Sequence, residues 1–238
     1  LLDTWHVAGL RGTGSTDYEV ERAFVPEGRW VQVGGTPVID RPLYRFSFFG
    51  ALACGVAAVT IGLARRAIDE LIELAADKRP QGSAKTLAER PVVQAEVARA
   101  EAAVRSARAL LDATIHDASE VAEAGRSDDR VRVGLRLAAT DATSRCVEAV
   151  DRCYHAGGGA AVYETSPLQR VWRDAHVAIQ HAMVAGRAHH DQVSLEFTGN
   201  PYDFIDRVAL PGPLGPVTAR AVGPNHPGTL TGIFIANM

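Results

Sequence analysis

The stretch that decides the fold is HAGGGAAVYETSPLQRVWRDAHVAIQHA, which covers residues 155–182. The stretch begins at the end of one helical pattern and contains three consecutive glycines. Ser166 and Pro167 follow, and this pair is typical of a helix N-cap and first helical position. Apolar and small residues then recur in steps of three and four at Trp172, Ala175, Ile179, Ala182 and Gly186. The spacing predicts a helix over 166–196 that is entered from a glycine loop.

Three further helical patterns precede this stretch, at 44–77, 90–124 and 128–156. In the second, small and apolar residues form a seam in steps of three and four, at Val97, Ala100, Val104, Ala107, Leu111, Thr114 and Ala118. Such a seam permits close helix approach. Pro91 suits the first turn of this helix and Gly125 its C-terminal cap. Four helices joined by short links predict a mainly α fold, an antiparallel four-helix bundle over 44–197.

The two ends of the chain have a different character. Residues 1–43 hold glycine turns and short strand-like pieces at 18–20 and 23–25, so we expect the remnant of a middle β-domain there. Residues 198–238 are rich in proline and glycine and predict an extended, irregular tail. The chain begins at Leu1 and carries no signal-peptide pattern, so we expect it to be shortened at its N-terminus.

Composition limits the function classes. A formal net charge of −3 with 22% charged residues gives no reason to expect a nucleic-acid partner. The three cysteines contain no Cys-x-x-Cys pair, which favours buried thiols in a reducing, cytoplasmic compartment. No histidine follows a glutamate by three residues, so the bundle has no di-iron motif and we predict no metal.

One stretch has the length of a membrane span. Residues 46–64 carry no charge, yet several of them are glycine or alanine, and the sequence continues directly into the charged helical pattern that begins at Arg65. A helix that is apolar all round also suits the centre of a protein. We therefore expect a buried core helix and no membrane partner.

Three segments together resemble a known family. The glycines 157–159 followed by SPLQRVWRD and a histidine resemble the type 2 C-terminal domain of the acyl-CoA dehydrogenase superfamily. The run GLRGTGSTD at 9–17 resembles the end of its β-domain, and KRPQG at 78–82 followed by Gln94 resembles a segment between its bundle helices. The resemblance covers about residues 1–196. It implies a flavin, FAD or FMN, a homotetramer, and an N-terminal helical domain that this chain lacks.

The same resemblance suggests where the cofactor binds. It places Thr13 and Ser15 near the flavin, Arg79 near its phosphate end, and Gly157 and Gly158 near a cofactor held by an adjacent subunit. Each position also has a plain structural interpretation. The glycine run that holds Thr13 and Ser15 fits a tight turn, Arg79 fits a surface charge, and Gly157 and Gly158 fit a loop between helices.

The reaction depends on two neighbouring residues. Acyl-CoA dehydrogenases often carry their catalytic glutamate where this chain has Ala182, and alanine cannot remove a proton. His181 matches the histidine of flavin-dependent hydroxylases of this fold, which use reduced flavin from a separate reductase and O₂. The resemblance therefore implies a two-component monooxygenase acting on an aromatic or similar small molecule. His181 would orient or deprotonate a phenol-like substrate, or steady a flavin peroxide. Two alternatives stay open, an acyl-CoA dehydrogenase and a non-catalytic helical oligomerisation fragment.

Overall fold

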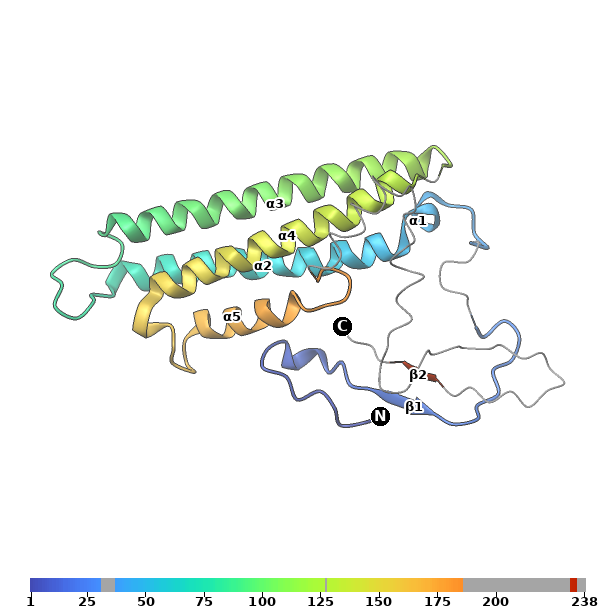
Figure 1. Cartoon of the computed structure of the whole chain (residues 1–238), viewed down its shortest axis with the longest axis horizontal. Helices are drawn as coiled ribbons and strands as arrows, with labels where there is room; N and C mark the ends of the chain where they lie inside the picture. The colour runs from blue at the N-terminus through green and yellow to red at the C-terminus, as the bar shows by residue number, and fades with distance from the viewer. Residues whose placement is uncertain (31–36, 127, 186–231, 235–238) are drawn as a thin grey trace.

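The computed structural model describes residues 1–30, 37–126, 128–185 and 232–234. Its helices are α1 (Pro42–Arg45), α2 (Phe48–Asp77), α3 (Pro91–Glu123), α4 (Asp129–Gly157) and α5 (Pro167–Ala178). Two short 3₁₀ turns are also present, η1 (Arg11–Thr13), which contains Thr13, and η2 (Gly158–Ala160), which contains Gly158. Figure 1 shows α2, α3, α4 and α5 joined at alternate ends, so successive helices run antiparallel. The predicted mainly α fold of close-packed helices is confirmed.

Local signals explain most helix boundaries. The pattern predicted over 44–77 divides at Phe46, whose extended backbone separates α1 from α2. Ser47 then caps α2, since its hydroxyl accepts a 3.1 Å hydrogen bond from the backbone N–H of Gly50. Asp128 caps α4 in the same way through the N–H of Arg130, at 2.8 Å. Gly125, just beyond α3, has the positive φ of 72° that favours glycine after a helix end.

Helix α5, which corresponds to the helix predicted over 166–196, is much shorter than predicted. Ser166 and Pro167 do occupy its N-cap and first position, although the Ser166 side chain makes no capping bond. The helix ends at Ala178, and the described residues 179–185 form turns, so the prediction of a helix through these residues is wrong. Positions 186–196 lie outside the described residues. His181 therefore sits in a turn and does not share a helix face with Asp174.

The core lies where α2, α4 and α3 meet. Its centre is lined by alanines, valines and leucines, among them Ala64, Ala67, Leu71, Ala107, Leu135 and Ala142. Small side chains at this contact let the helices approach closely, as the predicted seam of α3 requires. The three cysteines are buried here, and burial raises the pKa of Cys54 to about 11 and those of Cys146 and Cys153 to about 12.

Helix α2 packs with one side only. By length and composition alone it could cross a membrane, and 33% of an apolar 18-residue stretch within it is buried in the bundle. The opposite side carries exposed apolar residues, Phe48, Leu52 and Val59 among them. Gly55 and Gly62 lie in the same stretch of α2 as these residues. A Cβ added to either glycine would meet no atom within 4 Å, so no other part of the described chain covers them. The helix is thus a core element on one side and uncovered on the other.

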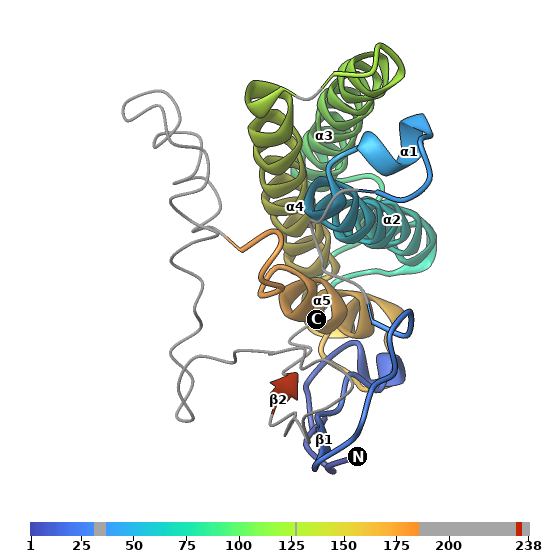
Figure 2. The same cartoon turned by 90° about the vertical axis from the view of Figure 1, so that its right-hand side faces the viewer.

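The N-terminal segment packs against α5. Strand β1 (Tyr18–Val20) pairs antiparallel with β2 (Gly232–Phe234), with Glu19 opposite Ile233. The strand predicted over 18–20 is confirmed, whereas residues 23–25 form no strand. Figure 2 shows α5 between the long helices and this segment. The rest of the predicted tail over 198–238 lies outside the described residues.

Candidate functional site

The structure places the candidate site residues at three separate positions. Gly157 and Gly158 lie at the C-terminal end of α4, close to the loop that joins α2 to α3. Thr13 and Ser15 lie in the N-terminal segment beside α5, and His181 follows the end of α5. Among the described residues, the cavity that Gly157 and Gly158 line does not include Thr13, Ser15 or His181.

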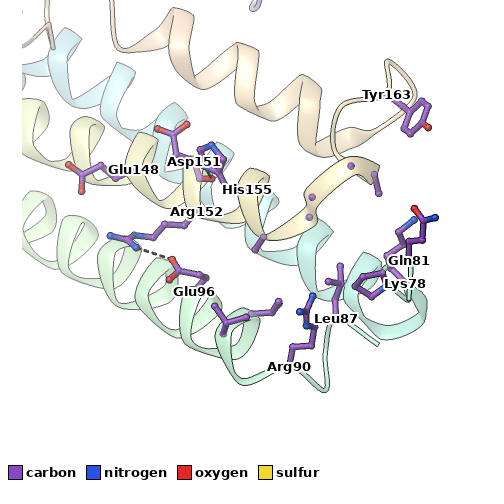
Figure 3. Close-up of a pocket in the computed structure, with 18 residues that line it drawn as sticks. Lys78, Gln81, Leu87, Arg90, Glu96, Glu148, Asp151, Arg152, His155 and Tyr163 are labelled. Atoms are coloured by element: carbon purple, nitrogen blue, oxygen red, sulfur yellow. Dashed lines mark hydrogen bonds and ion pairs between the residues drawn. The ribbon is translucent and has the colours of Figure 1, made fainter. Parts of the chain in front are cut away.

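A cavity of about 1010 Å³ opens at the glycine end of the bundle. Figure 3 shows side chains from α3, α4 and the α2–α3 loop converging on it. Gly158 has a positive φ of 59°, and a Cβ added to Gly158 or Gly159 would meet no atom within 4 Å. The backbone there is open to a ligand. The cavity wall includes Lys78, Gln81, Arg90, Glu96, Glu148, Asp151, Arg152, His155 and Tyr163.

Gly157 has a different role from Gly158. It is the last residue of α4 and is buried, although it also borders the cavity. A Cβ at Gly157 would lie 2.9 Å from Cδ1 of Leu168. A side chain here would have to displace Leu168, so the close packing of α4 and α5 favours glycine whatever binds in the cavity.

The charges of the cavity wall are partly paired. Arg152 donates a 2.9 Å hydrogen bond to Glu96, which joins α4 to α3 (Figure 3). This bond is the main reason that the pKa of Glu96 is lowered. Lys78 and Arg90 add two further cationic side chains to the wall. The wall also holds the carboxylates of Glu96, Glu148 and Asp151, so Lys78 and Arg90 are the cations that could face an anionic ligand beside the open glycine backbone.

Asp151 joins the cavity wall to an aromatic group. Its Oδ1 accepts hydrogen bonds from the indole of Trp172 at 2.7 Å and lies 2.9 Å from Nε2 of His176. Trp172 stacks on Tyr154 with ring centroids 5.3 Å apart. The carboxylate thereby anchors α5 to α4 beside the cavity.

Arg79 lies next to this cavity but is not among the residues that line it. Its exposed guanidinium donates to the carbonyl oxygen of Ala84 within the α2–α3 loop. Its neighbours Lys78, Pro80 and Gln81 do line the cavity. In this structure Arg79 shapes the loop that carries those neighbours.

Thr13 and Ser15 belong to a turn that is attached to α5. The Ser15 hydroxyl donates to Oγ1 of Thr13 at 2.9 Å, and Thr13 donates to the carbonyl of Leu10 at 3.0 Å. Leu10 has a φ of 50°, which is costly for a side chain of its size. Its backbone N–H donates a 2.6 Å hydrogen bond to Asp174, and this contact holds the turn.

The hydrogen-bond partner of Asp174 is the backbone of Leu10, which the spacing of residues in the sequence did not indicate. The spacing of Arg170 and Asp174 suits an ion pair within α5, but the described residues show no such pair, and Asp174 accepts from Leu10 instead. Next to it, Arg173 donates to the carbonyl of Ala8 at 3.2 Å. The Arg-Asp pair of the motif therefore fixes the N-terminal segment on the bundle.

His181 is half-buried in the turn after α5. Its Nδ1 accepts a 3.1 Å hydrogen bond from the backbone N–H of Met183. Burial, together with the positive charge of Arg136, lowers the pKa of His181. The lowered pKa favours the neutral imidazole, which can exchange a hydrogen bond with an oxygen atom without carrying a charge of its own.

Sequence patterns did not point to several of these residues. Arg136 is the clearest case, because it lies on the stripe of α4 that also holds Val133, Thr140 and Val147 and is only 8% exposed. An arginine within a buried stripe was the available signal. Asp151 and Arg152 had no such signal, since their partners come from α5 and α3.

Comparison with known proteins identifies the family. Residues 54–185 match the family model for the acyl-CoA dehydrogenase, C-terminal domain, which is more than half of the chain. Indole-3-acetate monooxygenase of Pseudomonas putida is 37% identical over 206 residues, which are 84% of this chain and 52% of that protein. The chain belongs to the acyl-CoA dehydrogenase C-terminal domain family. It spans about half the length of the curated relatives it matches.

Solved structures agree with this family. The present chain is similar to 3-HSA hydroxylase from Rhodococcus sp. RHA1, with a TM-score of 0.73 and 27% sequence identity. The match covers 83% of this chain and 53% of the hydroxylase chain. The present chain also matches XiaF from Streptomyces sp., solved in complex with FADH2 and glycerol, with a TM-score of 0.71 and 26% identity, over 84% and 52% of the two chains. Two of these three similar proteins are by name a monooxygenase and a hydroxylase, and the third was solved with a reduced flavin.

Proposed function

We propose that this chain forms the bundle part of the oxygenase of a two-component, flavin-dependent monooxygenase that acts on a small aromatic molecule. The observation that carries the proposal is the half-buried His181 in the turn after α5, whose Nδ1 accepts the N–H of Met183 and which is followed by Ala182. The similarity to indole-3-acetate monooxygenase supports an aromatic acid as the substrate. The overall reaction would consume substrate, O₂ and reduced flavin, and give hydroxylated substrate, oxidised flavin and water.

The residues at the glycine end of the bundle fit part of a flavin dinucleotide. Gly158 and Gly159 expose open backbone, and Lys78 and Arg90 supply positive charge for phosphate groups. When bound, a reduced flavin supplies the two electrons that activate O₂. The FADH2 complex of XiaF supports FAD as the flavin, and a flavin that binds in reduced form calls for a separate reductase.

The separation of the candidate residues supports an oligomer. Thr13, Ser15 and His181 lie away from the cavity that Gly158 borders, so one flavin would take the first group from one chain and the glycines from another. The exposed apolar side of α2 supplies additional surface for contact between copies. We propose a homotetramer in the cytoplasm. A chain that stays monomeric in light scattering at micromolar concentration would contradict this assembly.

Two other functions have weaker support. An acyl-CoA dehydrogenase needs a carboxylate base, and the turn over 181–185 offers His181, Ala182 and Met183 but no acidic residue. A purely structural oligomerisation domain would explain the apolar side of α2. It would not explain an open glycine backbone beside a cavity whose wall holds Lys78 and Arg90.

One experiment separates the three functions. The whole protein is mixed with reduced FAD, O₂ and indole-3-acetate, and product formed per flavin oxidised is measured. A separate anaerobic sample of oxidised enzyme is mixed with an acyl-CoA. The monooxygenase proposal predicts hydroxylated product close to one per flavin and no bleaching by the acyl-CoA. Bleaching without oxygen-dependent product would indicate a dehydrogenase, and absence of flavin binding would indicate a structural domain.

A further inference from the structure

Arg136 reaches from α4 to the turn that carries His181. Its side chain is on the buried stripe of α4, and Nη1 lies 2.9 Å from the sulfur atom of Met183. Nη2 donates to the carbonyl oxygen of Ala182 at 3.4 Å. Two groups of one guanidinium therefore contact the two residues that follow His181. The planar, rigid fork of arginine suits such a double contact.

The turn also determines which nitrogen of His181 carries the proton. Nδ1 accepts a hydrogen bond from the backbone N–H of Met183 at 3.1 Å. A nitrogen that accepts this bond cannot itself be protonated, so the neutral ring carries its proton on Nε2. Protonation of Nδ1 would bring two N–H groups face to face and break the bond.

We propose that Arg136 is a positioning residue for His181, which it holds, together with the backbone of Met183, as a neutral imidazole with the proton on Nε2. Arg136 does this in two ways. Its contacts with Ala182 and Met183 fix the turn, and its positive charge opposes a second positive charge on the ring. The inference rests on the proposed role of His181 in oxygen transfer.

The electrostatic surroundings of His181 agree with this arrangement. Burial is the largest cause of its lowered pKa, and the charge of Arg136 is the second. The neighbouring residues of the turn, Ala182, Met183 and Val184, are uncharged. Among the described residues, Arg136 from α4 is the charged group that acts on the ring.

The consequence is a choice between two roles for His181. A histidine with its proton on Nε2 donates a hydrogen bond from that nitrogen. To remove a phenol proton through Nε2, the ring would first need its proton on Nδ1, at the expense of the Met183 bond. We therefore assign His181 the role of hydrogen-bond donor to an oxygen atom at the reaction centre.

The test measures the titration of His181 without any flavin. Hydrogen–deuterium exchange at the imidazole Cε1, read by peptide mass spectrometry across a pH series, gives a midpoint for each histidine of the whole protein. The variants are Arg136→Met and Arg136→Gln, which remove the charge, and Arg136→Lys, which keeps it. Arg145→Met, on the exposed side of α4, is the matched control, and exchange at the exposed His116 is the internal reference.

The expected result has a definite sign. The His181 midpoint moves up in Arg136→Met and Arg136→Gln, and it stays at the wild-type position in Arg136→Lys and Arg145→Met. In oxygen-transfer assays Arg136→Lys still loses about tenfold in rate, because the ammonium cannot make both contacts with the turn. An unchanged midpoint in folded Arg136→Met and Arg136→Gln would overturn the inference.

Two further outcomes keep the inference separate from the proposed function. If the uncharged variants do not fold, the wild type tests the neutral ring that the inference requires, since its His181 midpoint must lie below the midpoint in urea. A midpoint in the folded protein at or above the unfolded one would also overturn the inference. If His181→Ala leaves oxygen transfer intact while the Arg136 variants move the midpoint, the role of His181 fails but its coupling to Arg136 stands.

Discussion

The backbone N–H of Leu10 donates a 2.6 Å hydrogen bond to the carboxylate of Asp174, which lies 164 positions further along the chain. This bond fixes the turn that contains Thr13 and Ser15 against α5. The same helix ends three residues before His181. Two of the proposed cofactor residues and the proposed catalytic residue therefore depend on one helix for their positions.

Asp174→Ala tests this relationship. The variant leaves the Leu10 N–H without its partner, and we expect the free energy of unfolding to fall by about 1–3 kcal/mol. Backbone hydrogen exchange over residues 8–16 should accelerate more than exchange within α3. Asp112→Ala, at an exposed pair on α3, serves as the control and should change neither quantity. Equal protection of residues 8–16 in both variants would contradict the anchoring role.

Gly9 provides a steric test of the same contact. A Cβ at Gly9 would fall against the backbone of Arg173 and lie only 2.7 Å from the backbone nitrogen of Asp174, whereas a Cβ at Gly12 would meet nothing within 4 Å. Backbone cannot yield as a flexible side chain does, so Gly9→Ala should destabilise the protein by about 1–3 kcal/mol. Gly12→Ala should be nearly neutral. Thermal unfolding of the two variants side by side measures the difference, and similar melting temperatures would speak against tight docking.

Gly159 tests the proposed cofactor cavity. A Cβ at this position would meet no protein atom within 4 Å, so we expect Gly159→Leu to fold and to place its side chain beside the cavity. We expect the affinity for reduced FAD to fall by about tenfold, or about 1.4 kcal/mol. Ala124→Leu, at an exposed position after α3, is the matched control. Unchanged flavin affinity in Gly159→Leu would remove this cavity from the proposed flavin site.

Glu101 links stability to pH. Hydrogen bonds from Arg105 and Arg65 lower its pKa below the ordinary value of 4.5. A lowered folded pKa contributes stability above the unfolded pKa, and this contribution is lost as pH falls through the folded pKa. Glu101→Gln should therefore cost less than about 1 kcal/mol at neutral pH, and the difference from wild type should shrink in acid. Urea unfolding across pH measures it, with exposed Glu73→Gln as the control. A difference that grows on acidification would have the wrong sign.

Local sequence signals predicted most of the bundle. Proline at the start of α3, glycine after its end and the small-residue seam all act within a few residues, so the pattern alone located that helix. The end of α5 was different. No breaker separates Ala178 from Gly186, yet the chain turns at Ile179, because Arg136 binds the carbonyl of Ala182 and Val184 is buried at 1% exposure. Contacts from another helix overrode local propensity there.

The candidate site was predictable only in part. The glycines and His181 could be named because the resemblance assigns them. The close approach that favours glycine at position 157, and the contacts of Arg136 and Asp151, depend on how helices far apart in sequence pack together. The roles proposed for Thr13, Ser15, Arg79, Gly157, Gly158 and His181 stay predictions.

The most direct test of the central claim follows oxygen into product. The whole protein is mixed with reduced FAD, isotopically labelled O₂ and indole-3-acetate, in wild type, His181→Ala and, as a control, His116→Ala on the surface of α3. We predict labelled product in wild type and His116→Ala, and at least about 100-fold less in His181→Ala, whose flavin is still reoxidised. Unlabelled product, or a His181→Ala variant as active as wild type, would contradict the claim that this chain serves a monooxygenase through His181.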